Sequence, residues 1–378
     1  MNIAVIGCGT MGLGIAQHFA HYEHFVKIFD QSDQAVQNAR VKLKASLDSL
    51  VSKGSLIDQH AQELLQRLSW VNQLDALSDC DLVIEAIIEN KEIKQALFSS
   101  LSEIVNSECI LASNTSSISI TALAASVRQP ERFLGVHFFN PVHAMKLVEI
   151  IPAMQTDPMI VTQCKTILES TQKIAVVAKD CPGFIVNRIA RPYYSESIRI
   201  IEEGIARIEE IDEIMRTVGG FRMGPFELMD FIGHDVNYSV TEIVWREFFF
   251  EDRFKPSLTQ KKLVEAGYLG RKTGRGFYTY PYEKPQIIVA AEKAQSIFRR
   301  VICMLINEAY DALYLSLGSE QDLELAMTKG VNYPKGLLSW GKELGLASVK
   351  QTLDQLYEFY GEDRYRCSPG IRKQLELL

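Results

Sequence analysis

The sequence has few of the features that mark secreted, metal-binding or membrane-spanning proteins. Its 378 residues include seven cysteines, an odd number without a Cys-x-x-Cys pair, which argues against zinc and a disulfide framework and for a reducing compartment. No apolar run has the length of a membrane span, and Met1-Asn2 leads into an apolar segment without a basic leader. We therefore expect a cytoplasmic protein without a metal.

The sequence also has no excess of positive charge. Its 40 basic and 47 acidic residues give a net charge of −7, so nothing in the overall field attracts nucleic acid. A polyanionic ligand would need a local basic patch. The clearest one outside the C-terminal third lies within residues 40–53, although such a run is ordinarily a solvated helix face. The length fits two or three domains.

A glycine-rich loop follows the first apolar run, residues 3–6. Gly7-Cys8-Gly9-Thr10-Met11-Gly12 has the spacing G-x-G-x-x-G, and residues 14–20 then read as a helix. Gly7 permits a tight turn, Gly9 allows a pyrophosphate to approach the backbone, and Gly12 lets helix and strand pack closely. The helix N-terminus favours phosphate groups. With both flanking elements present, the motif predicts a dinucleotide site.

Asp30 ends a second predicted strand, residues 25–29, and lies 18 residues after Gly12 (30 minus 12). A carboxylate in this place bonds the ribose hydroxyls of the dinucleotide. No Arg or Lys stands between Asp30 and Arg40 to accept a 2′-phosphate. This favours NAD over NADP. The alternative is an aspartate that only forms a turn.

Two further apolar runs end in polar residues. Residues 82–88 read as a buried strand that leads to Glu89-Asn90, and residues 109–112 as the next strand, followed by Ser113-Asn114-Thr115-Ser116-Ser117. The second polar run could merely cap a helix that begins near Ile118. It also lies at the carboxyl end of a parallel strand, where open α/β sheets bind ligands.

His137 and Glu149 form the most informative pair. His137 lies where the apolar run 133–136 ends, and Asn140-Pro141 predicts a turn directly after it. The chain returns through residues 147–151, in which Glu149 is the only charged residue. A carboxylate there is costly to bury without a partner, and an imidazole held by it is suited to act as the base for an alcohol. A core histidine with a structural ion pair is an equally good interpretation.

After Asp180-Cys181-Pro182-Gly183 the pattern becomes entirely helical, and this helical part contains a repeat. The spacing predicts helices over residues 184–204, 208–218, 225–232, 236–249, 257–266, 295–316, 320–329 and 346–360. Residues recur at an offset of 112 (300 minus 188): Arg188 as Arg300, Glu196 as Glu308, Met215 as Met327, Phe221 as Tyr333, Gly224 as Gly336 and Gly233 as Gly345.

The two copies differ where chemistry is expected. Asn187 becomes Arg299, and Asp230 becomes Lys342. The second copy therefore reads as structural. The expected domains are residues 1–181, 182–282 and 283–378.

Taken together, these motifs resemble the 3-hydroxyacyl-CoA dehydrogenases over nearly the whole chain. The resemblance rests on Gly7 to Gly12, Glu85-Ala86-x-x-Glu89-Asn90, Ser113 to Ser117, His137-Phe138-Phe139-Asn140-Pro141, Pro182-Gly183-Phe184-x-x-Asn187-Arg188 and Gly270-Arg271-Lys272-Thr273-Gly274-x-Gly276-Phe277-Tyr278. It implies an α/β Rossmann-like NAD-binding domain, followed by two all-α helical repeats of the family's C-terminal type. The implied reaction is NAD-dependent oxidation of a 3-hydroxyacyl-CoA.

The resemblance also implies roles for single residues. His137 is the expected base and Glu149 its partner, while Ser116 and Asn187 contact the substrate oxygen and Asn140 shapes the site. The expected NAD ligands are Gly7, Gly9, Thr10, Met11, Gly12, Asp30, Glu89, Lys94 and Asn114. Ser46 and Lys53 are expected to meet coenzyme A, which gives the basic patch a polyanionic ligand.

Within the family, the phenylacetate-degradation branch, which takes 3-hydroxyadipyl-CoA, is the most similar. The similar stretches are residues 187–196, 330–334 and 360–366. Arg191 lies four residues after Asn187 on a helical run, so both side chains share a face, and its guanidinium could pair with the distal carboxylate of such a substrate. The alternative is a structural salt bridge to Glu196 or to a carboxylate of the second copy. Long members of the branch carry an extra segment, of which only residues 281–294 remain here.

The expected partners are an acyl-CoA substrate and, for assembly, a second copy of the chain. Neither nucleic acid nor a membrane is expected. The two helical repeats would form an internal pseudo-dimer that covers apolar surface buried by dimerisation in single-copy members. The competing hypotheses are a non-enzymatic structural or NAD-sensing member, and a dehydrogenase of a hydroxy acid without coenzyme A, such as carnitine.

Overall fold

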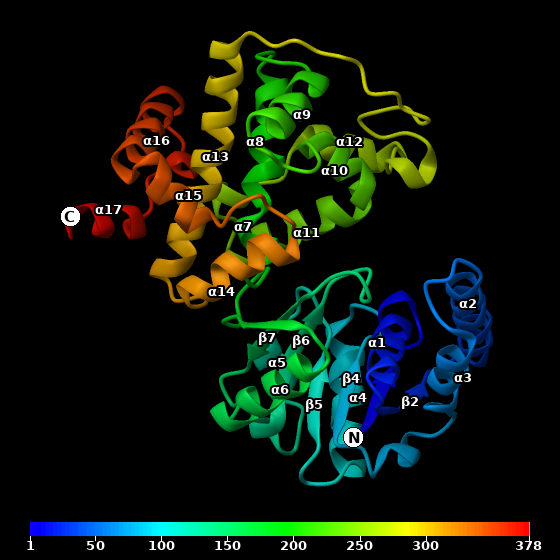
Figure 1. Ribbon diagram of the computed structural model, residues 1–378. Helices are drawn as coiled ribbons and strands as arrows, with labels where there is room; N and C mark the ends of the chain where they lie inside the picture. The colour runs from blue at the N-terminus through cyan, green and yellow to red at the C-terminus, as the bar shows by residue number, and fades with distance from the viewer. Residues whose placement is uncertain (378) are drawn as a thin grey trace. The chain divides into compact units, whose positions relative to one another are not determined.

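The computed structural model describes residues 1–377, which form two compact units. The first unit comprises residues 1–180 and the second starts at Cys181. The division falls within the turn-rich stretch 180–183. Figure 1 shows a sheet with helices in the first unit and helices alone in the second.

The first unit is built on one eight-stranded sheet, in the order β3-β2-β1-β4-β5-β6-β7-β8. The strands from β3 to β6 are parallel, β7 runs antiparallel to β6, and β8 is parallel to β7. This confirms the Rossmann-like fold. The strand order reverses between β1 and β4, the place where such sheets bind ligands. The strands are β1 Asn2–Ile6, β2 Phe25–Phe29, β3 Leu68–Val71, β4 Leu82–Glu85, β5 Ile110–Ser113, β6 Phe133–Phe138, β7 Leu147–Pro152 and β8 Ile174–Val177.

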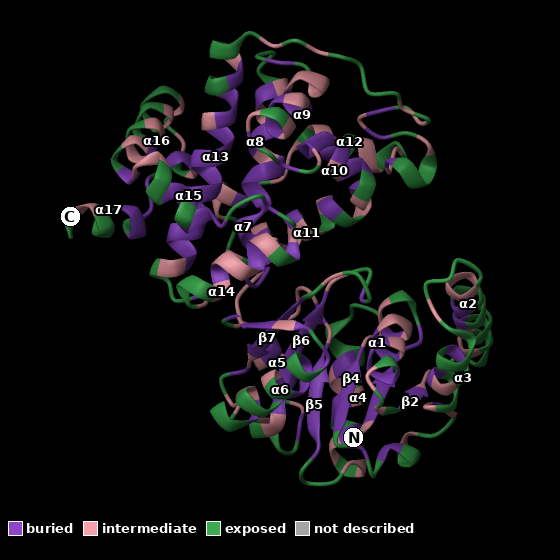
Figure 2. Cartoon of the chain, in the orientation of Figure 1, coloured by how far each residue is buried: buried purple, intermediate pink, exposed green. Residues whose placement is uncertain are grey.

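The central strands are fully buried, as expected of a mostly parallel sheet covered by helices; Figure 2 shows them in purple. The helices of this unit are α1 Thr10–His21, α2 Asp33–Ser52, α3 Asp58–Gln66, α4 Lys91–Ile104, α5 Ile120–Ala124 and α6 Pro158–Ser170. The helices α2 and α3 lie between β2 and β3 in the sequence. β3 is a four-residue edge strand, which is too short to be recognised from periodicity.

The second unit is entirely helical among the described residues. Its helices are α7 Val186–Ile189, α8 Arg191–Glu202, α9 Ile208–Thr217, α10 Pro225–Ile232, α11 His234–Glu247, α12 Leu258–Glu265, α13 Ala291–Tyr314, α14 Glu320–Leu325, α15 Leu337–Leu344, α16 Leu346–Tyr360 and α17 Pro369–Glu376, with a π-helix at Ala326–Gly330. The prediction missed α15 and α17. The predicted helix 184–204 breaks at Ala190, because Pro192 lies in the first turn of α8. Among residues 1–377, every helix is too short or too polar to cross a bilayer.

The helical repeat is visible in the capping of two equivalent helices. The Asp212 carboxylate accepts hydrogen bonds from two backbone amides at the start of α10, each at 2.9 Å. At the same offset, Glu324 accepts from the backbone amide of Leu338 at 2.8 Å at the start of α15. Gly224 and Gly336 are the N-caps, and a Cβ at either would overlap the capping carboxylate. The shared glycines therefore serve the same cap in both copies.

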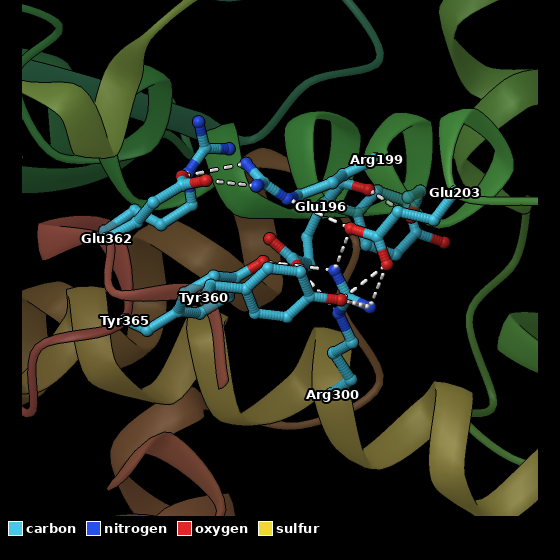
Figure 3. A network of polar contacts seen from close by, with 10 residues as sticks. Glu196, Arg199, Glu203, Arg300, Tyr360, Glu362 and Tyr365 are labelled. Carbon is cyan, nitrogen blue, oxygen red and sulfur yellow. Dashed lines mark hydrogen bonds and ion pairs between the residues drawn. The ribbon is translucent and has the colours of Figure 1, made fainter. Parts of the chain in front are cut away.

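The two copies also exchange ion pairs. α8 of the first copy packs on α13 of the second. Arg300 from α13 binds Glu196 of α8 through its Nε at 2.5 Å, and it binds Glu203 as well. Figure 3 shows this network, in which the hydroxyls of Tyr360 and Tyr365 also meet the guanidinium. The repeats thus share one buried polar interface.

Candidate active site

The glycine-rich loop follows β1 and leads into α1. Gly7 has φ +96°, and a Cβ on it would lie 2.5 Å from the carbonyl oxygen of Ala86. A Cβ on Gly12 would overlap the carbonyl of Gly7. At Gly9, the N-cap of α1, an added Cβ meets nothing within 4 Å. Gly7 and Gly12 are therefore required by the fold, whereas Gly9 faces open space that a pyrophosphate fits.

Asp30 stands at the end of β2, beside this loop. Its Oδ2 accepts a hydrogen bond from the backbone amide of Cys8 at 3.0 Å, and its Oδ1 accepts from the amide of Ser32 at 2.9 Å. The Cys8 thiol donates to the same Oδ2 at 3.3 Å. Burial, followed by the bond to Asp30, raises the pKa of Cys8 to about 12, so the thiol remains a donor. Sequence reasoning passed over Cys8, which links Asp30 to the loop.

A second carboxylate cluster lies at the ends of β4 and β5. Lys94 of α4 is buried, with its Nζ 2.5 Å from Glu85 and 3.3 Å from Glu89. Glu89 accepts hydrogen bonds from the hydroxyls of Thr115 at 2.5 Å and Ser117 at 2.9 Å. Burial raises the pKa of Glu89, but the Lys94 charge and these hydroxyls outweigh it, so the pKa lies below its ordinary value. Glu89 is therefore held ionised.

Glu85 is the member of this cluster that the sequence analysis named in a family motif but gave no role. Its fully buried carboxylate accepts from the backbone amide of Ile87 at 2.7 Å and from the Ser113 hydroxyl at 2.6 Å. A lone glutamate within the apolar run 82–88 was the signal, the same one that singled out Glu149. Together with Lys94, Glu85 fixes the loops that leave β4 and β5.

The polar run 113–117 leaves β5 as predicted. The backbone amide of Ser116 donates to Glu89 at 3.2 Å, while its hydroxyl makes no hydrogen bond within residues 1–377. The amide oxygen of Asn114 accepts from the backbone amide of Phe138 at 2.9 Å. Asn114 therefore ties the end of β5 to the strand that carries His137.

His137 and Glu149 lie directly opposite each other on the antiparallel strands β6 and β7. Nδ1 of His137 is 2.7 Å from Oε2 of Glu149, whose side chain is completely buried. A carboxylate at this distance can accept a hydrogen bond from Nδ1, which orients the ring and leaves Nε2 as the nitrogen that can meet a substrate. This geometry is that of a histidine base with an orienting carboxylate.

The turn after His137 is held by a buried lysine that the sequence reasoning did not single out. Asn140 is exposed and joined to Pro141 by a cis peptide bond. Lys173, just before β8, donates from Nζ to the carbonyls of Val142 at 2.5 Å and Met145 at 2.7 Å. Burial lowers the pKa of Lys173 to about 8. The loop that contains Asn140 is therefore anchored to the sheet.

Of the two expected coenzyme A contacts, Ser46 lies on α2 and Lys53 is the C-cap that follows it. Ser46 and Lys53 are both exposed, and their spacing of seven residues is about two helical turns, so they share one face. Arg40, from the same basic patch, lies over the ring of Trp70 at 5.1 Å. The patch is a surface that can receive a polyanion.

In the second unit, Asn187 of α7 is half-buried, and Arg191 at the start of α8 is 4% exposed. Nε of Arg191 donates to the backbone carbonyl of Asn187 at 2.7 Å. The expected alternative, a salt bridge from Arg191 to Glu196 or to the second copy, is wrong. Glu196 pairs with Arg300, and within residues 1–377 no carboxylate forms an ion pair with Arg191. Asn187 and Arg191 lie on either side of the break at Ala190, so the predicted helical face that both side chains would share stays a prediction.

Known protein families account for almost the whole chain. Residues 2–181 match the NAD-binding domain of 3-hydroxyacyl-CoA dehydrogenases. The C-terminal domain of the same family matches two stretches, residues 183–280 and 297–377. The repeat found in the sequence is therefore a duplication of this helical domain.

Individual relatives agree with this. The 3-hydroxyadipyl-CoA dehydrogenase of Escherichia coli K12 is 38% identical over 99% of this chain and 97% of its own length. A probable 3-hydroxybutyryl-CoA dehydrogenase of Deinococcus radiodurans is 42% identical, over 74% of this chain and all of its own. A crystal structure of an E. coli K12 3-hydroxybutyryl-CoA dehydrogenase superposes with a TM-score of 0.94 at 37% identity, covering 100% of this chain and 98% of that one.

A shorter solved structure separates the two copies. The (S)-3-hydroxybutyryl-CoA dehydrogenase of Ralstonia eutropha is 40% identical, with a TM-score of 0.71, and covers 74% of this chain and 99% of its own. The share covered, 74%, is that of residues 1–280, the length of the chain through the first match of the C-terminal domain. The chain belongs to the 3-hydroxyacyl-CoA dehydrogenase family and is an NAD-dependent oxidoreductase.

Proposed function

We propose that the chain oxidises an (S)-3-hydroxyacyl-CoA to the 3-oxoacyl-CoA with His137 as the general base. NAD, when bound, supplies the hydride acceptor for C3. Nε2 of His137 takes the hydroxyl proton, and Glu149 stabilises the imidazolium that results. The 2.7 Å contact between His137 Nδ1 and the buried Glu149 carboxylate carries this proposal. In the reverse reduction the imidazolium returns the proton.

Ser116 and Asn187 are proposed to hold the substrate oxygen, and Asn140 to shape the site. Holding the oxygen keeps the reacting carbon in position for hydride transfer. The fixed surroundings support these roles, because Glu89 holds the Ser116 amide and Lys173 holds the loop of Asn140. Both residues are placed by groups that are themselves buried or hydrogen-bonded.

The proposed NAD site combines the glycine-rich loop with the strand ends beside it. Gly7, Gly9, Thr10, Met11 and Gly12 would cradle the pyrophosphate at the N-terminus of α1. Asp30 would bond the ribose, while Glu89 and Asn114 contribute from the ends of β4 and β5. Lys94 is buried against Glu89, so we propose that it serves NAD by holding that carboxylate. The coenzyme A part of the substrate would meet Ser46 and Lys53.

We propose 3-hydroxyadipyl-CoA as the preferred substrate, with 3-hydroxybutyryl-CoA as the alternative. The E. coli relative of that name aligns with 99% of this chain, including both helical copies. Two relatives named for 3-hydroxybutyryl-CoA align with about three quarters of it. The E. coli structure named for 3-hydroxybutyryl-CoA covers the whole chain, which is why that substrate stands as the alternative. The seven thiols, none of them in a disulfide, support a reducing cytoplasmic location.

We also propose that residues 182–282 and 283–378, which follow the NAD-binding domain of residues 1–181 in the sequence, act as an internal pseudo-dimer of two domains. Their exchanged ion pairs and the packing of α8 on α13 support this arrangement. A homodimer of the whole chain would have to form through surfaces other than the one between the two repeats. Sedimentation of the full chain distinguishes monomer from dimer.

The test of the activity is NADH formation with matched thioesters. We expect turnover of (S)-3-hydroxybutyryl-CoA and 3-hydroxyadipyl-CoA with NAD, little with NADP, and none with the free hydroxy acids or carnitine. The (R)-thioester is the matched control for stereochemistry. Turnover of a free acid or of carnitine, with none of either (S)-thioester, contradicts the proposal.

A further inference from the structure

Arg191 is a buried cation without a counter-charge. Its guanidinium has five N–H donors, and those in use go to neutral acceptors: the Asn187 carbonyl at 2.7 Å, the Asn237 carbonyl at 3.3 Å and the Thr241 hydroxyl at 3.0 Å. Nη2 makes no hydrogen bond within residues 1–377. Burial lowers the pKa of Arg191, yet an arginine stays charged in proteins. An unpaired buried charge of this kind is costly, so its retention indicates an anionic ligand.

Two other buried arginines of this unit, in contrast to Arg191, have carboxylate partners. Arg188 binds Glu308 and Asp311, and Arg300 binds Glu196 and Glu203. All three side chains are at least nine-tenths buried. The fold therefore supplies carboxylates for its structural arginines and none for Arg191.

Tyr333 provides a second unsatisfied group near this cation. Its side chain is 5% exposed, and its hydroxyl has no hydrogen-bond partner. The ring of Tyr333 lies 5.8 Å from the ring of Tyr193, which is two residues after Arg191. Burial raises the pKa of Tyr333 well above its usual value, and the charge of Arg191 counteracts this in part. The hydroxyl is therefore protonated and can donate. Tyr333 follows the π-helix Ala326–Gly330, which packs against α7, the helix of Asn187.

We infer that Arg191 and Tyr333 together bind the terminal carboxylate of a dicarboxylic acyl chain, with Tyr333 contributed by the second helical copy. The inference rests on the proposed function, since it assigns the far end of the same substrate. A carboxylate only accepts hydrogen bonds, and it matches an arginine fork with a hydroxyl beside it. The ring of Tyr194, 4.9 Å from the guanidinium, lies under the charge as a cation–π partner.

The short separation of Asn187 and Arg191 agrees with the length of such a substrate. The two residues flank the break between α7 and α8, and Nε of Arg191 donates to the Asn187 carbonyl at 2.7 Å. In 3-hydroxyadipyl-CoA the carboxylate carbon is three carbon–carbon bonds from C3. A substrate whose C3 oxygen is held by Asn187, as proposed, would therefore have its carboxylate end within reach of Arg191.

The repeat shows that these two residues are not required by the helical fold itself. At the offset of 112, Arg191 corresponds to Cys303 and Tyr333 to Phe221. The equivalent place in the other half is thus apolar and carries neither the charge nor the hydroxyl. On this inference the second copy has more than the structural role expected of it, because it provides Tyr333, one of the two recognition groups.

The test compares two substrates of equal chain length, 3-oxoadipyl-CoA and 3-oxohexanoyl-CoA, which differ in a terminal carboxylate or methyl group. The quantity measured is the ratio of their kcat/KM values with NADH. We expect Arg191→Met to lower this ratio by about tenfold or more and Tyr333→Phe by about threefold to tenfold, the worth of a charge-assisted hydrogen bond. Tyr333→Phe should not lower the Tm, because the hydroxyl has no protein partner to lose.

Tyr310→Phe is the matched control, because it also removes a buried tyrosine hydroxyl. That hydroxyl donates to the Leu338 carbonyl at 3.1 Å, so its loss should leave the ratio of the two kcat/KM values unchanged. If Arg191→Met does not fold, Tyr333→Phe decides the question alone. A ratio in Tyr333→Phe equal to that of the wild type overturns the inference. Failure of the wild type to reduce either thioester contradicts the proposed function instead, so the two failures are distinguishable.

Discussion

Arg188 and Glu308 are 120 residues apart in the sequence, and their side chains meet with Nε 2.6 Å from Oε1. The equivalent residues of the other copy, Arg300 and Glu196, meet in the same way. Each arginine therefore takes its glutamate from the opposite copy, which is the reciprocity of a two-fold contact. All four side chains are buried. The ion pairs join the duplicated helices into one core.

The buried pair predicts a large loss of stability when one partner is removed. Arg188→Met leaves Glu308 and Asp311 with only Arg253 beside them, so we expect a loss of about 3–5 kcal/mol in unfolding free energy, measured with urea. Arg128→Met is the control. It breaks an exposed pair with Glu103 and should cost less than about 1 kcal/mol. Equal losses in both variants contradict the role given to Arg188.

Truncation tests the covering role of the second copy. A chain that ends at Tyr280 exposes the face of α8 that packs on α13, and leaves Arg188 and Glu196 without partners. We expect this protein to dimerise or to be insoluble, as measured by sedimentation. The full chain serves as the reference. A truncated protein that is a stable monomer with full activity shows that the second copy does not cover that face.

Asp30 is expected to select NAD. In Asp30→Ala the ribose loses a hydrogen-bond acceptor and a 2′-phosphate is no longer repelled. NADH affinity should fall by about tenfold, the worth of a hydrogen bond to a charged group, and the preference over NADPH should narrow. Fluorescence titration with both cofactors measures this. Because Asp30 also holds the Cys8 amide, Asp30→Asn is the control that retains an acceptor. A wild type that prefers NADPH is the contrary result.

His18 gives the first unit an acid-sensitive site. The Thr171 hydroxyl donates to the Leu168 carbonyl at 2.7 Å, so His18 Nε2 must donate to Thr171, 3.0 Å away. Burial, then the charges of Lys173, His21 and His24, lowers the pKa of His18 to about 3. The His18 imidazole therefore takes up a proton more readily in the unfolded chain than in the folded one. As a result, the contribution of His18 to stability is lost as pH falls from about 6.5 towards 3.

In His18→Gln this part of the pH dependence disappears. We compare the free energies of unfolding between about pH 7 and about pH 5. Below about pH 6.5 the wild type should lose up to about 1.4 kcal/mol more of this free energy per pH unit than the variant does. Urea unfolding at several pH values measures the difference. Parallel curves for the two proteins are incompatible with a His18 that is buried in its neutral form.

The fold and the central pair follow from local patterns, whereas the supporting groups depend on distant partners. A glycine-rich turn between a strand and a helix, and a glutamate in an apolar run, are readable from neighbouring residues. Lys173 meets carbonyls about 30 residues earlier, and Glu85 meets a serine 28 residues later. Glu196 was expected for Arg191 but binds Arg300, 104 residues away. Local spacing in the sequence does not predict which of several arginines forms the ion pair with a buried carboxylate.

Glu149 is expected to matter almost as much as His137. Glu149→Gln keeps the shape but removes the negative charge beside Nδ1, so kcat should fall by about two to four orders of magnitude, because the pair acts as a unit. Steady-state NADH oxidation with acetoacetyl-CoA measures it. Glu103→Gln, which changes an exposed carboxylate, is the control for the general loss of a charge. A Glu149→Gln enzyme with a kcat near that of the wild type contradicts the claim that Glu149 acts together with His137.

The most direct test of the proposed chemistry is NADH oxidation by wild type and His137→Gln with 3-oxoadipyl-CoA and acetoacetyl-CoA, with NADH binding titrated in parallel. We expect His137→Gln to lose about two to four orders of magnitude in kcat on both substrates, with NADH affinity changed by less than about twofold, since His137 lies outside the glycine-rich loop. A His137→Gln enzyme that retains wild-type kcat on either substrate contradicts His137 as the base, and with it the proposed mechanism.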